Sequence, residues 1–174
     1  MVDYKKDKKR WDSNKLWFVP QYKIIRLKRK CEILKENNKL LYYLGWLRYH
    51  RLEIKYGVNI PVSTKIGSGF KIEHIGGIVI NPNVVIGENC NIYNGVTIGK
   101  EKRGKREGNP VIGDSVWIGA NAVVVGKISI GDDVLIAPNS FVNFDVPAHS
   151  IVIGNPAKII QRDNATAEYI TNKI

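Results

Sequence analysis

Three histidines carry the side chains best suited to proton transfer at neutral pH, namely His50, His74 and His149. An imidazole titrates near neutrality and is the commonest general base in enzymes. His74 falls where a regular spacing of aliphatic residues is interrupted by two extra residues, and interruptions of a repeat often carry function. We take His74 as the candidate base, against the more common structural role of a hydrogen-bonded histidine.

The same histidines are poorly placed to bind a metal. They are widely separated along the chain, and His50 precedes the repeat altogether. Cys31 and Cys90 are too few for a four-ligand zinc site or a disulfide framework. The chain starts without the apolar stretch of a signal peptide. We therefore expect no metal and a reducing, cytoplasmic environment.

A six-residue period of aliphatic residues positions the candidate base. The period covers three runs: Ile60, Ile66 and Ile72; Ile80, Ile86, Ile92 and Ile98; and Ile112, Ile118, Val124, Ile130, Ile136 and Val142. Glycine often follows the aliphatic residue, where a tight turn requires it. Such a period suits short strands joined by turns and stacked into a solenoid, with three hexads in each triangular coil and about five coils in all.

The period is broken twice. The spacing from Ile72 to Ile80 is eight residues, two more than the period, and the extra residues lie around His74. The spacing from Ile98 to Ile112 is fourteen residues, which is two hexads plus two. Residues 100–109 contain no aliphatic side chain, so they must leave the column as a loop. The loop is rich in cations, which either bind an anion or are simply solvated: Lys100, Lys102, Arg103, Lys105 and Arg106.

The charge of the chain divides at Gly57. The 174 residues contain 27 Lys and Arg against 16 Asp and Glu, a net charge of +11. Residues 1–57 hold 16 cations and 6 acids, which leaves +10, while residues 58–174 hold 11 and 10, which leaves +1. Apolar residues three and four apart predict helices over about 24–36 and 40–56, and Gly57 suits a C-cap. We expect a basic helical segment at 1–57, a β domain at 58–160 and a tail at 161–174.

The placed histidine and the hexads resemble the hexapeptide-repeat acyltransferases, in particular the branch similar to serine acetyltransferases. The matching segments are Ile66-Gly67, Ile72-Glu73-His74, Gly77-Ile78-Val79-Ile80, Asn94-Gly95-Val96-Thr97-Ile98-Gly99, Ile112-Gly113-Asp114, Val116-Trp117-Ile118-Gly119-Ala120 and Gly154-Asn155-Pro156-Ala157-Lys158. The resemblance covers about residues 50–160. It implies a mainly β fold, a left-handed parallel β-helix with a short α-helical N-terminal segment, assembled as a homotrimer with active sites between subunits.

The resemblance also assigns roles to residues. It implies that His74 takes the proton of a hydroxyl that attacks a thioester, and that Asn59 stands where serine-specific enzymes have the Asp that pairs with this histidine. Glu73, Asn94 and Asn109 are implied to face the acceptor. A backbone carbonyl or a neighbouring subunit remains an alternative to Asn59 for orienting the imidazole ring.

Acetyl-CoA is the implied co-substrate, bound in a groove between subunits. The resemblance places the backbone of Ala120 at the thioester or pantetheine end, Pro138 and Asn139 further along, and Lys158 near the phosphates. Trp117 is expected to form a wall of the groove, or else to pack on the outer face.

We infer the acceptor from two positions at which the sequence departs from the serine-specific enzymes. Asn59 replaces an Asp, and Gly108-Asn109 stands where serine enzymes have an Arg-His pair, so an obvious partner for the serine carboxylate is missing. Together with the short helical segment, these departures predict acetylation of a saccharide hydroxyl, in a capsule or other surface polysaccharide precursor. Serine O-acetylation for cysteine biosynthesis is the alternative.

A third reading, of another class, is a basic trimeric binding module. Residues 1–57 carry no nucleic-acid motif, so nucleic acid is not expected. Cations and aromatic residues before residue 19 instead predict peripheral contact with an anionic membrane, at its inner face: Lys5, Lys6, Lys8, Lys9, Arg10, Trp11, Trp17 and Phe18.

Overall fold

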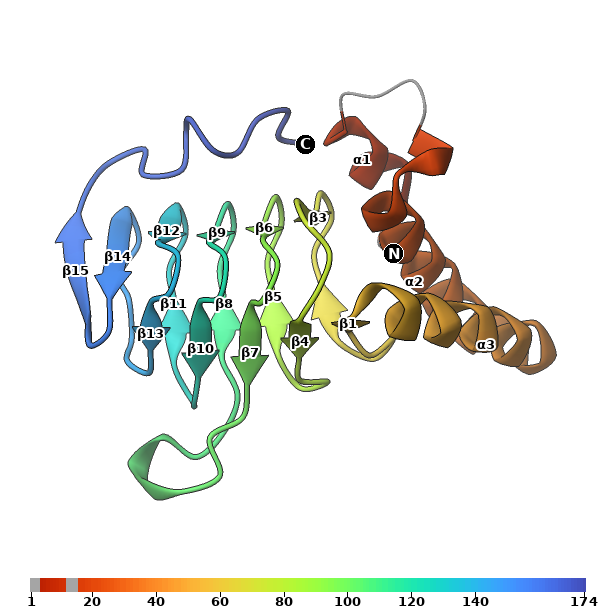
Figure 1. Ribbon diagram of the computed structural model, residues 1–174, viewed down its shortest axis with the longest axis horizontal. Coiled ribbons are helices and arrows are strands. Elements are labelled where there is room, and N and C mark those ends of the chain that lie inside the picture. The colour runs from red at the N-terminus through yellow and green to blue at the C-terminus, as the bar shows by residue number, and fades with distance from the viewer. Residues whose placement is uncertain (1–3, 12–15) are drawn as a thin grey trace.

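A column of short parallel strands carries a helical arm at one end (Figure 1). The computed structural model describes residues 4–11 and 16–174. The arm contains a short helix, a 3-10 turn and two long helices: α1 Tyr4–Lys9, Leu16–Phe18, α2 Pro20–Asn37 and α3 Lys39–Tyr56. No helix of this described part is long and apolar enough to cross a membrane.

Three sheets form the sides of the column. Sheet A contains β1 Val58–Asn59, β4 Ile78–Ile80, β7 Thr97–Gly99, β10 Val123–Val125 and β13 Phe141–Val142. Sheet B contains β2 Lys65–Ile66, β5 Val85–Ile86, β8 Val111–Ile112 and β11 Ser129–Ile130. Sheet C contains β3 Lys71–Ile72, β6 Asn91–Ile92, β9 Trp117–Ile118, β12 Val134–Ile136, β14 Ser150–Gly154 and β15 Ala157–Gln161.

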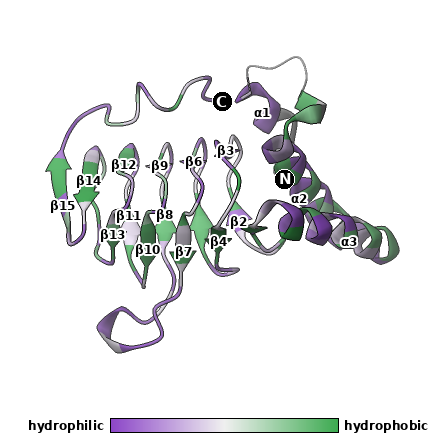
Figure 2. Ribbon diagram, in the orientation of Figure 1, coloured by the Kyte–Doolittle hydropathy of each residue, from purple (hydrophilic) through white to green (hydrophobic). Residues whose placement is uncertain are grey.

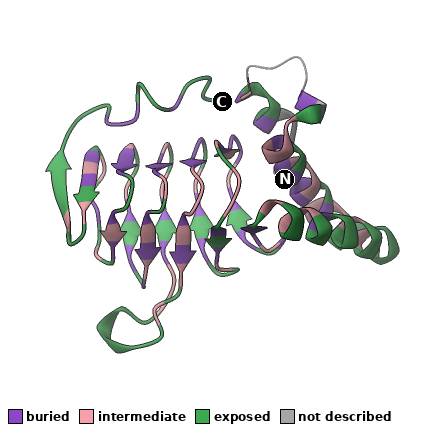
Figure 3. Cartoon of the chain, viewed as in Figure 1, coloured by how far each residue is buried: buried purple, intermediate pink, exposed green. Residues whose placement is uncertain are grey.

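The six-residue period becomes one strand per hexad, as the sequence predicts. Ile112 pairs with Ile130, so a regular coil takes three hexads. The periodic aliphatic side chains point inward and are buried throughout, as Figure 3 illustrates by the buried colour on the strands. Among the strands of the described residues, β15 alone runs antiparallel, on β14.

The two irregular coils are where the sequence predicts them. Ile66 pairs with Ile86, so that coil exceeds three hexads, and the surplus lies in the turn that holds His74. Ile86 pairs with Ile112, which makes a longer coil still, whose surplus is the loop 100–109. Figure 2 shows this loop as a hydrophilic hairpin projecting from the column between β7 and β8.

The coil has three kinds of corner, and their positions decide which side chains can meet. The chain runs from sheet A to B to C and back to A in each coil. The C-to-A corner comprises residues 73–77, 93–96, 119–122 and 137–140. The A-to-B corner includes the loop 100–109, which lies between β7 and β8.

Helices α2 and α3 form an antiparallel hairpin that turns at Asn38, whose side chain accepts from the Leu41 N–H at 3.0 Å and caps α3. Helix α3 ends at Tyr56, and Gly57 follows with φ 61°, the left-handed conformation that favours glycine at this position. The Tyr49 hydroxyl donates to the Ile60 carbonyl at 2.6 Å. The helix is thereby joined to the first coil of the column.

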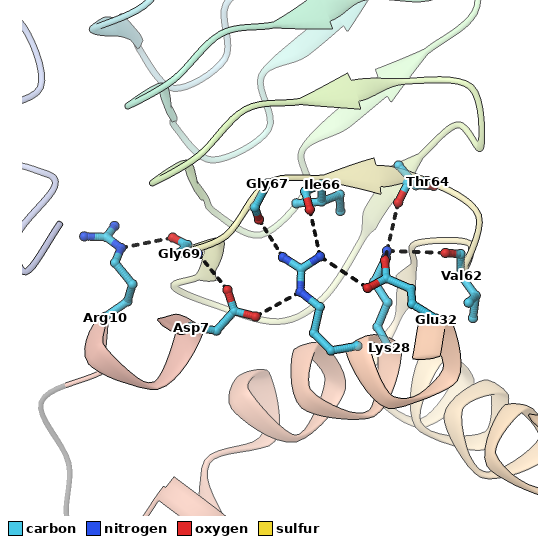
Figure 4. Close-up of polar contacts among 10 residues, drawn as sticks. Asp7, Arg10, Lys28, Glu32, Val62, Thr64, Ile66, Gly67 and Gly69 are labelled. Atoms are coloured by element: carbon cyan, nitrogen blue, oxygen red, sulfur yellow. Dashed lines mark hydrogen bonds and ion pairs between the residues drawn. The ribbon is translucent and has the colours of Figure 1, made fainter. Parts of the chain in front are cut away.

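Buried cations dock the arm on that coil (Figure 4). Arg29 donates to Asp7 at 2.9 Å and to the carbonyl oxygens of Ile66 and Gly67 at 2.7 and 2.6 Å. Asp7 in turn accepts from the Gly69 N–H at 2.7 Å. Similar bonds run from Lys28 to the Thr64 carbonyl at 2.8 Å and from Arg10 to the Gly69 carbonyl at 3.0 Å.

These contacts remove Arg10 from the membrane face predicted before residue 19, which otherwise stays a prediction, because Lys6, Lys8, Lys9 and Phe18 are exposed. Arg10 is 1% exposed, and it is used inside the molecule together with Asp7. The side chains of Lys5 and Trp17 lie outside the described part. The arm's charge therefore serves, in part, to hold the arm on the column.

Candidate active site

His74 lies at the first C-to-A corner, two residues after the end of β3, and is exposed. The two extra residues of this coil place the imidazole on a turn rather than on a strand face. Its ring meets the edge of Tyr93 from the next coil, with centroids 5.4 Å apart and an interplanar angle of 65°. Within the described part of the chain, neither ring nitrogen has a hydrogen-bond partner. The imidazole is positioned by an aromatic contact, and its nitrogens remain available to a substrate.

Four other predicted residues follow His74 along the same corner. Asn94 and Ala120 lie at this corner in the next two coils, and Pro138 and Asn139 lie there in the coil after these. The Asn121 N–H donates to the Asn94 carbonyl, and the Asn139 N–H donates to the Ala120 carbonyl at 2.9 Å. Coils stack at about 4.8 Å, so three coils separate His74 from Pro138 by about 14 Å. The corner thus lines up the candidate base with the residues predicted to bind acetyl-CoA.

A row of aromatic rings leads from His74 across sheet C to a cavity. The ring centroids of Tyr93 and Trp117 are 4.9 Å apart, and those of Trp117 and Tyr169 are also 4.9 Å apart. Trp117 and Pro138 line a cavity of about 640 Å³ between sheet C and the C-terminal tail. Its other walls include Leu135, Ile151, Ile153 and Arg162. Asp163 and Glu168 also line the cavity, so this mainly apolar slot has charges of both signs at its edge.

The tail that closes this cavity is fixed by Asp133. The carboxylate accepts from the N–H groups of Ala165 and Thr166, both at 3.0 Å, from the Thr166 hydroxyl at 2.7 Å, and contacts His149 Nδ1 at 2.9 Å. Desolvation alone would raise the pKa of Asp133, but the bonds from Thr166, His149 and Ala165 outweigh it and lower this pKa to about 2. Figure 1 shows the tail returning from β15 toward α1.

Glu73 and Asn59 are placed differently from each other. Glu73 Oε1 accepts from Asn91 at 2.8 Å and pairs with Lys71 Nζ at 3.0 Å, so this carboxylate already has two partners on sheet C. Asn59 is exposed at the end of β1, beside a depression of about 240 Å³ that His50 also lines. In the part of the chain that the structure describes, Asn59 makes no hydrogen bond with His74.

Asn109 lies at the A-to-B corner and so does not meet His74 within one chain. Its side-chain oxygen is buried and, among the described residues, has no hydrogen-bond partner. The loop before it is held by a bridge between Glu101 and Gly108 and by Arg106, whose carbonyl accepts from the Lys127 N–H at 2.9 Å. A site that uses both His74 and Asn109 therefore requires a second chain.

Lys158 extends from β15 at the last coil, opposite Ile153, which lines the tail cavity. It is exposed. No group of three or more His, Cys, Asp or Glu suited to a metal occurs in residues 4–11 and 16–174. The described chemistry is thus that of an imidazole and a mainly apolar cavity, with Arg162 in its lining and Lys158 on the neighbouring strand.

Sequence reasoning missed Tyr93 and Tyr169. Burial raises the pKa of Tyr93, which keeps its phenol protonated at neutral pH. Ile72 pairs with Ile92, so Tyr93 stands one coil after Glu73 once the inserted residues are counted. That spacing was readable from the sequence. Tyr169 reaches Trp117 only through the path of the tail, which has no periodic signal.

A family model of a bacterial transferase hexapeptide (six repeats) matches residues 109–143. Two curated relatives are the serine acetyltransferases of Helicobacter pylori, 41% identical over 62% of this chain and 63% of the relative, and of Staphylococcus aureus, 44% identical over 62% of this chain and 50% of the relative. The crystal structure of Brucella abortus serine acetyltransferase in complex with coenzyme A is 25% identical, with a TM-score of 0.77, over 92% of this chain and 67% of that one. The chain spans between about a third and two thirds of the length of the curated relatives it matches.

The fold is a parallel β-helix that matches the left-handed β-helix of these hexapeptide-repeat transferases, as the sequence predicts. Among them, the chain is similar in sequence and in structure to serine acetyltransferases.

The predicted saccharide acceptor is wrong. Relatives that are 39 to 44% identical are serine acetyltransferases, which favours the alternative reading. The prediction relied on Asn59 and on the Gly108-Asn109 pair as the residues that select the acceptor. Neither position is hydrogen-bonded to His74 among the described residues, so their identity alone is a poor guide to what binds beside the imidazole.

Proposed function

We propose that this chain is an acetyl-CoA-dependent O-acetyltransferase that acetylates the hydroxyl group of L-serine, with His74 as the general base. The observation that carries the proposal is the C-to-A corner. There an exposed imidazole is joined by Tyr93 and Trp117 to an apolar cavity of about 640 Å³. We infer serine as the acceptor because relatives of this chain are serine acetyltransferases.

His74 performs the proton transfers in this reaction. One ring nitrogen takes the hydroxyl proton as the serine oxygen attacks the thioester carbonyl. The C–O bond forms, the carbonyl oxygen becomes an oxyanion, and the imidazolium then returns its proton to the sulfur as the C–S bond breaks. The products are O-acetylserine and the free thiol of CoA, with His74 neutral again.

The tail cavity suits the pantetheine arm of acetyl-CoA. Trp117, Leu135 and Ile151 offer an apolar wall, and Pro138 ends it at the corner. Arg162 and Lys158 are the cations available to phosphate groups at this end of sheet C. In this proposal the backbone around Ala120, which lies at the C-to-A corner one coil before Pro138, contacts the thioester end.

The assembly in this proposal is a homotrimer with active sites between subunits. His74 and Asn109 lie at different corners of a three-sided column, so a neighbouring chain would bring its loop 100–109 to the first chain's His74. Apolar side chains beside the A-to-B corner are exposed and would be covered by such a neighbour: Val79, Val85 and Val111. Loop cations such as Lys102 and Arg103 would then be available to the serine carboxylate.

The test is acetyl transfer from acetyl-CoA to L-serine, followed as release of the CoA thiol and as O-acetylserine by mass spectrometry. Replacing His74→Ala should lower kcat/KM by about 10² to 10⁴, the usual contribution of a general base. His149→Asn is the matched control, because His149 is also exposed and lies at a different corner, and an Asn amide in place of Nδ1 can still donate to Asp133, which fixes the tail. It should retain most of the activity.

Two results would contradict the proposal. Binding of acetyl-CoA without turnover on L-serine would remove the acceptor, and activity of the His74→Ala variant within threefold of the parent would remove the base. Circular dichroism of each variant shows that the column is intact, so that lost activity is not lost fold.

A further inference from the structure

The groove between α2 and α3 gathers much of the positive charge of the arm. It is a cleft of about 310 Å³, lined entirely by residues of these two helices. Five of the lining side chains are cationic: Lys23, Arg26, Lys30, Arg48 and Lys55. Its remaining walls are Leu27, Leu52 and Tyr56.

The acids of both helices face elsewhere. Glu32 pairs with Arg29 and Lys28, and it lines a different depression with Glu36. Glu53 Oε1 accepts from the Ile60 N–H at 2.9 Å, on the side of the hairpin that meets the column. None of the residues that line the cleft is acidic. The four lining cations other than Arg26 therefore share a recess whose walls hold no carboxylate, and their summed positive potential attracts an anion.

The geometry fits an anion with several phosphate groups. The helices are antiparallel, so Lys23 and Lys55 lie at one end of the cleft and Lys30 and Arg48 at the other. Lys23 and Lys30 are about 10 Å apart along the axis of α2. The planar guanidinium of Arg48 is suited to bidentate contact with phosphate oxygens, and the lysines add charge along the cleft. The Lys55 ammonium lies over the Tyr56 ring, 5.4 Å from the ring centroid.

We propose that the α2–α3 cleft binds a compact anion carrying two or more phosphate groups. A recess with a half-buried floor of Leu27, Leu52 and Tyr56 admits a small molecule or a projecting headgroup, whereas a flat membrane surface or a nucleic-acid duplex would not fill it. The cleft shares no lining residue with the tail cavity on sheet C, so this site is separate from the acetyl-CoA site proposed above.

The first experiment is calorimetric titration of the full chain with tripolyphosphate, with inorganic phosphate as the single-phosphate comparison. The test variant is Lys30→Gln with Arg48→Gln, and the control variant is Lys35→Gln with Arg51→Gln. Each pair removes one Lys from α2 and one Arg from α3, but only the first pair lines the cleft. We expect the affinity for tripolyphosphate to fall at least tenfold in the test variant and less than twofold in the control. All four side chains are exposed, so neither variant should lose its fold.

Equal weakening by both pairs would overturn the proposal, because it would show a response to overall charge. Inorganic phosphate binding as tightly as tripolyphosphate would also overturn it. Displacement of tripolyphosphate by CoA that is equally strong in the Lys30→Gln and Arg48→Gln double variant would place the anion in the acetyl-CoA site instead. Vesicles containing phosphatidylinositol bisphosphate form a second arm. Competition between these vesicles and tripolyphosphate identifies a lipid headgroup as a source of the phosphates, while tripolyphosphate binding without vesicle binding identifies a soluble anion.

Discussion

The helical arm and the β-helix use charge in opposite ways. The β-helix, at +1, balances its charges and is organised by aliphatic side chains that repeat every six residues. The arm, at +10, buries Arg10, Lys28 and Arg29 against backbone carbonyls of the column and leaves other cations in an open cleft. Apolar periodicity therefore specifies the column, whereas directed hydrogen bonds specify where the arm sits. Each region should consequently fail for a different reason.

Breaking the buried charge of the arm should have the largest effect on stability. Replacing Arg29→Met leaves the Asp7 carboxylate buried without its partner, and removing one partner of a buried pair costs about 3 to 5 kcal/mol. Urea unfolding measures the loss. Arg51→Met, on the exposed face of α3, is the control and should change stability by less than about 0.5 kcal/mol.

The same cycle includes Asp7→Asn with Arg29→Met. The double variant should recover part of the loss, since the uncompensated carboxylate is gone. A loss below about 1 kcal/mol for Arg29→Met alone would mean that solvent reaches the contact and that the arm is held by its apolar residues.

In the column, the equivalent weak point is a turn glycine. Gly95 has φ 71°, and a Cβ there would lie 1.9 Å from Asn121 Oδ1 of the next coil. Gly104 has φ 75°, with nothing within 4 Å of its Cβ position. Gly104→Ala should cost about 1 kcal/mol from backbone strain alone, and Gly95→Ala should cost about 2 to 3 kcal/mol because strain and overpacking add. Thermal unfolding of the two variants isolates the close approach between coils, and equal melting temperatures would show that Asn121 moves aside.

The tail gives the smallest effect and one that depends on pH. The pKa of Asp133 is lowered to about 2, below its value of about 3.9 in an unfolded chain, so its bonds to the tail stabilise the protein fully above about pH 4. This contribution is lost as the pH falls through about 2. Asp133→Asn should therefore lower stability by about 1 kcal/mol at pH 6, followed by the fluorescence of Trp117 beneath Tyr169. A difference from the parent that stays constant down to about pH 2 would assign the loss to something other than the carboxylate charge.

The sequence predicts the column well, and it predicts the docking of the arm and the path of the tail poorly. The coils, the two irregular turns and the position of His74 were predictable because a buried aliphatic residue every six positions leaves few alternatives. The same spacing, once corrected for the inserted residues, places Ala120, Pro138 and Asn139 on one corner with His74. The docking of the arm was not predictable, since Asp7, Arg10 and Arg29 act on backbone groups that have no sequence signature. The path of the tail was not predictable either, because it depends on a few hydrogen bonds to the side chains of Asp133 and Asn89.

The acceptor could not be predicted for a related reason. Asn59 and Asn109 were compared with a motif one position at a time, but three-sided geometry sends His74 and Asn109 to different corners. A substitution at one corner can be compensated by a residue that another chain brings to it, and a single sequence does not contain that pairing.

The buried cations of Figure 4 have a consequence for how copies of the chain avoid one another. β1, β2 and β3 are the outermost strands of their sheets, and a sheet edge invites another strand to pair with it. At this end of the column, the side chains of Lys28, Arg29 and Arg10 donate hydrogen bonds to backbone carbonyl oxygens. At the other end, the antiparallel β15 covers β14, the last parallel strand of sheet C. The arm therefore acts as a plug. Without it, the edges of β1, β2 and β3 would be open to pairing with strands of another chain.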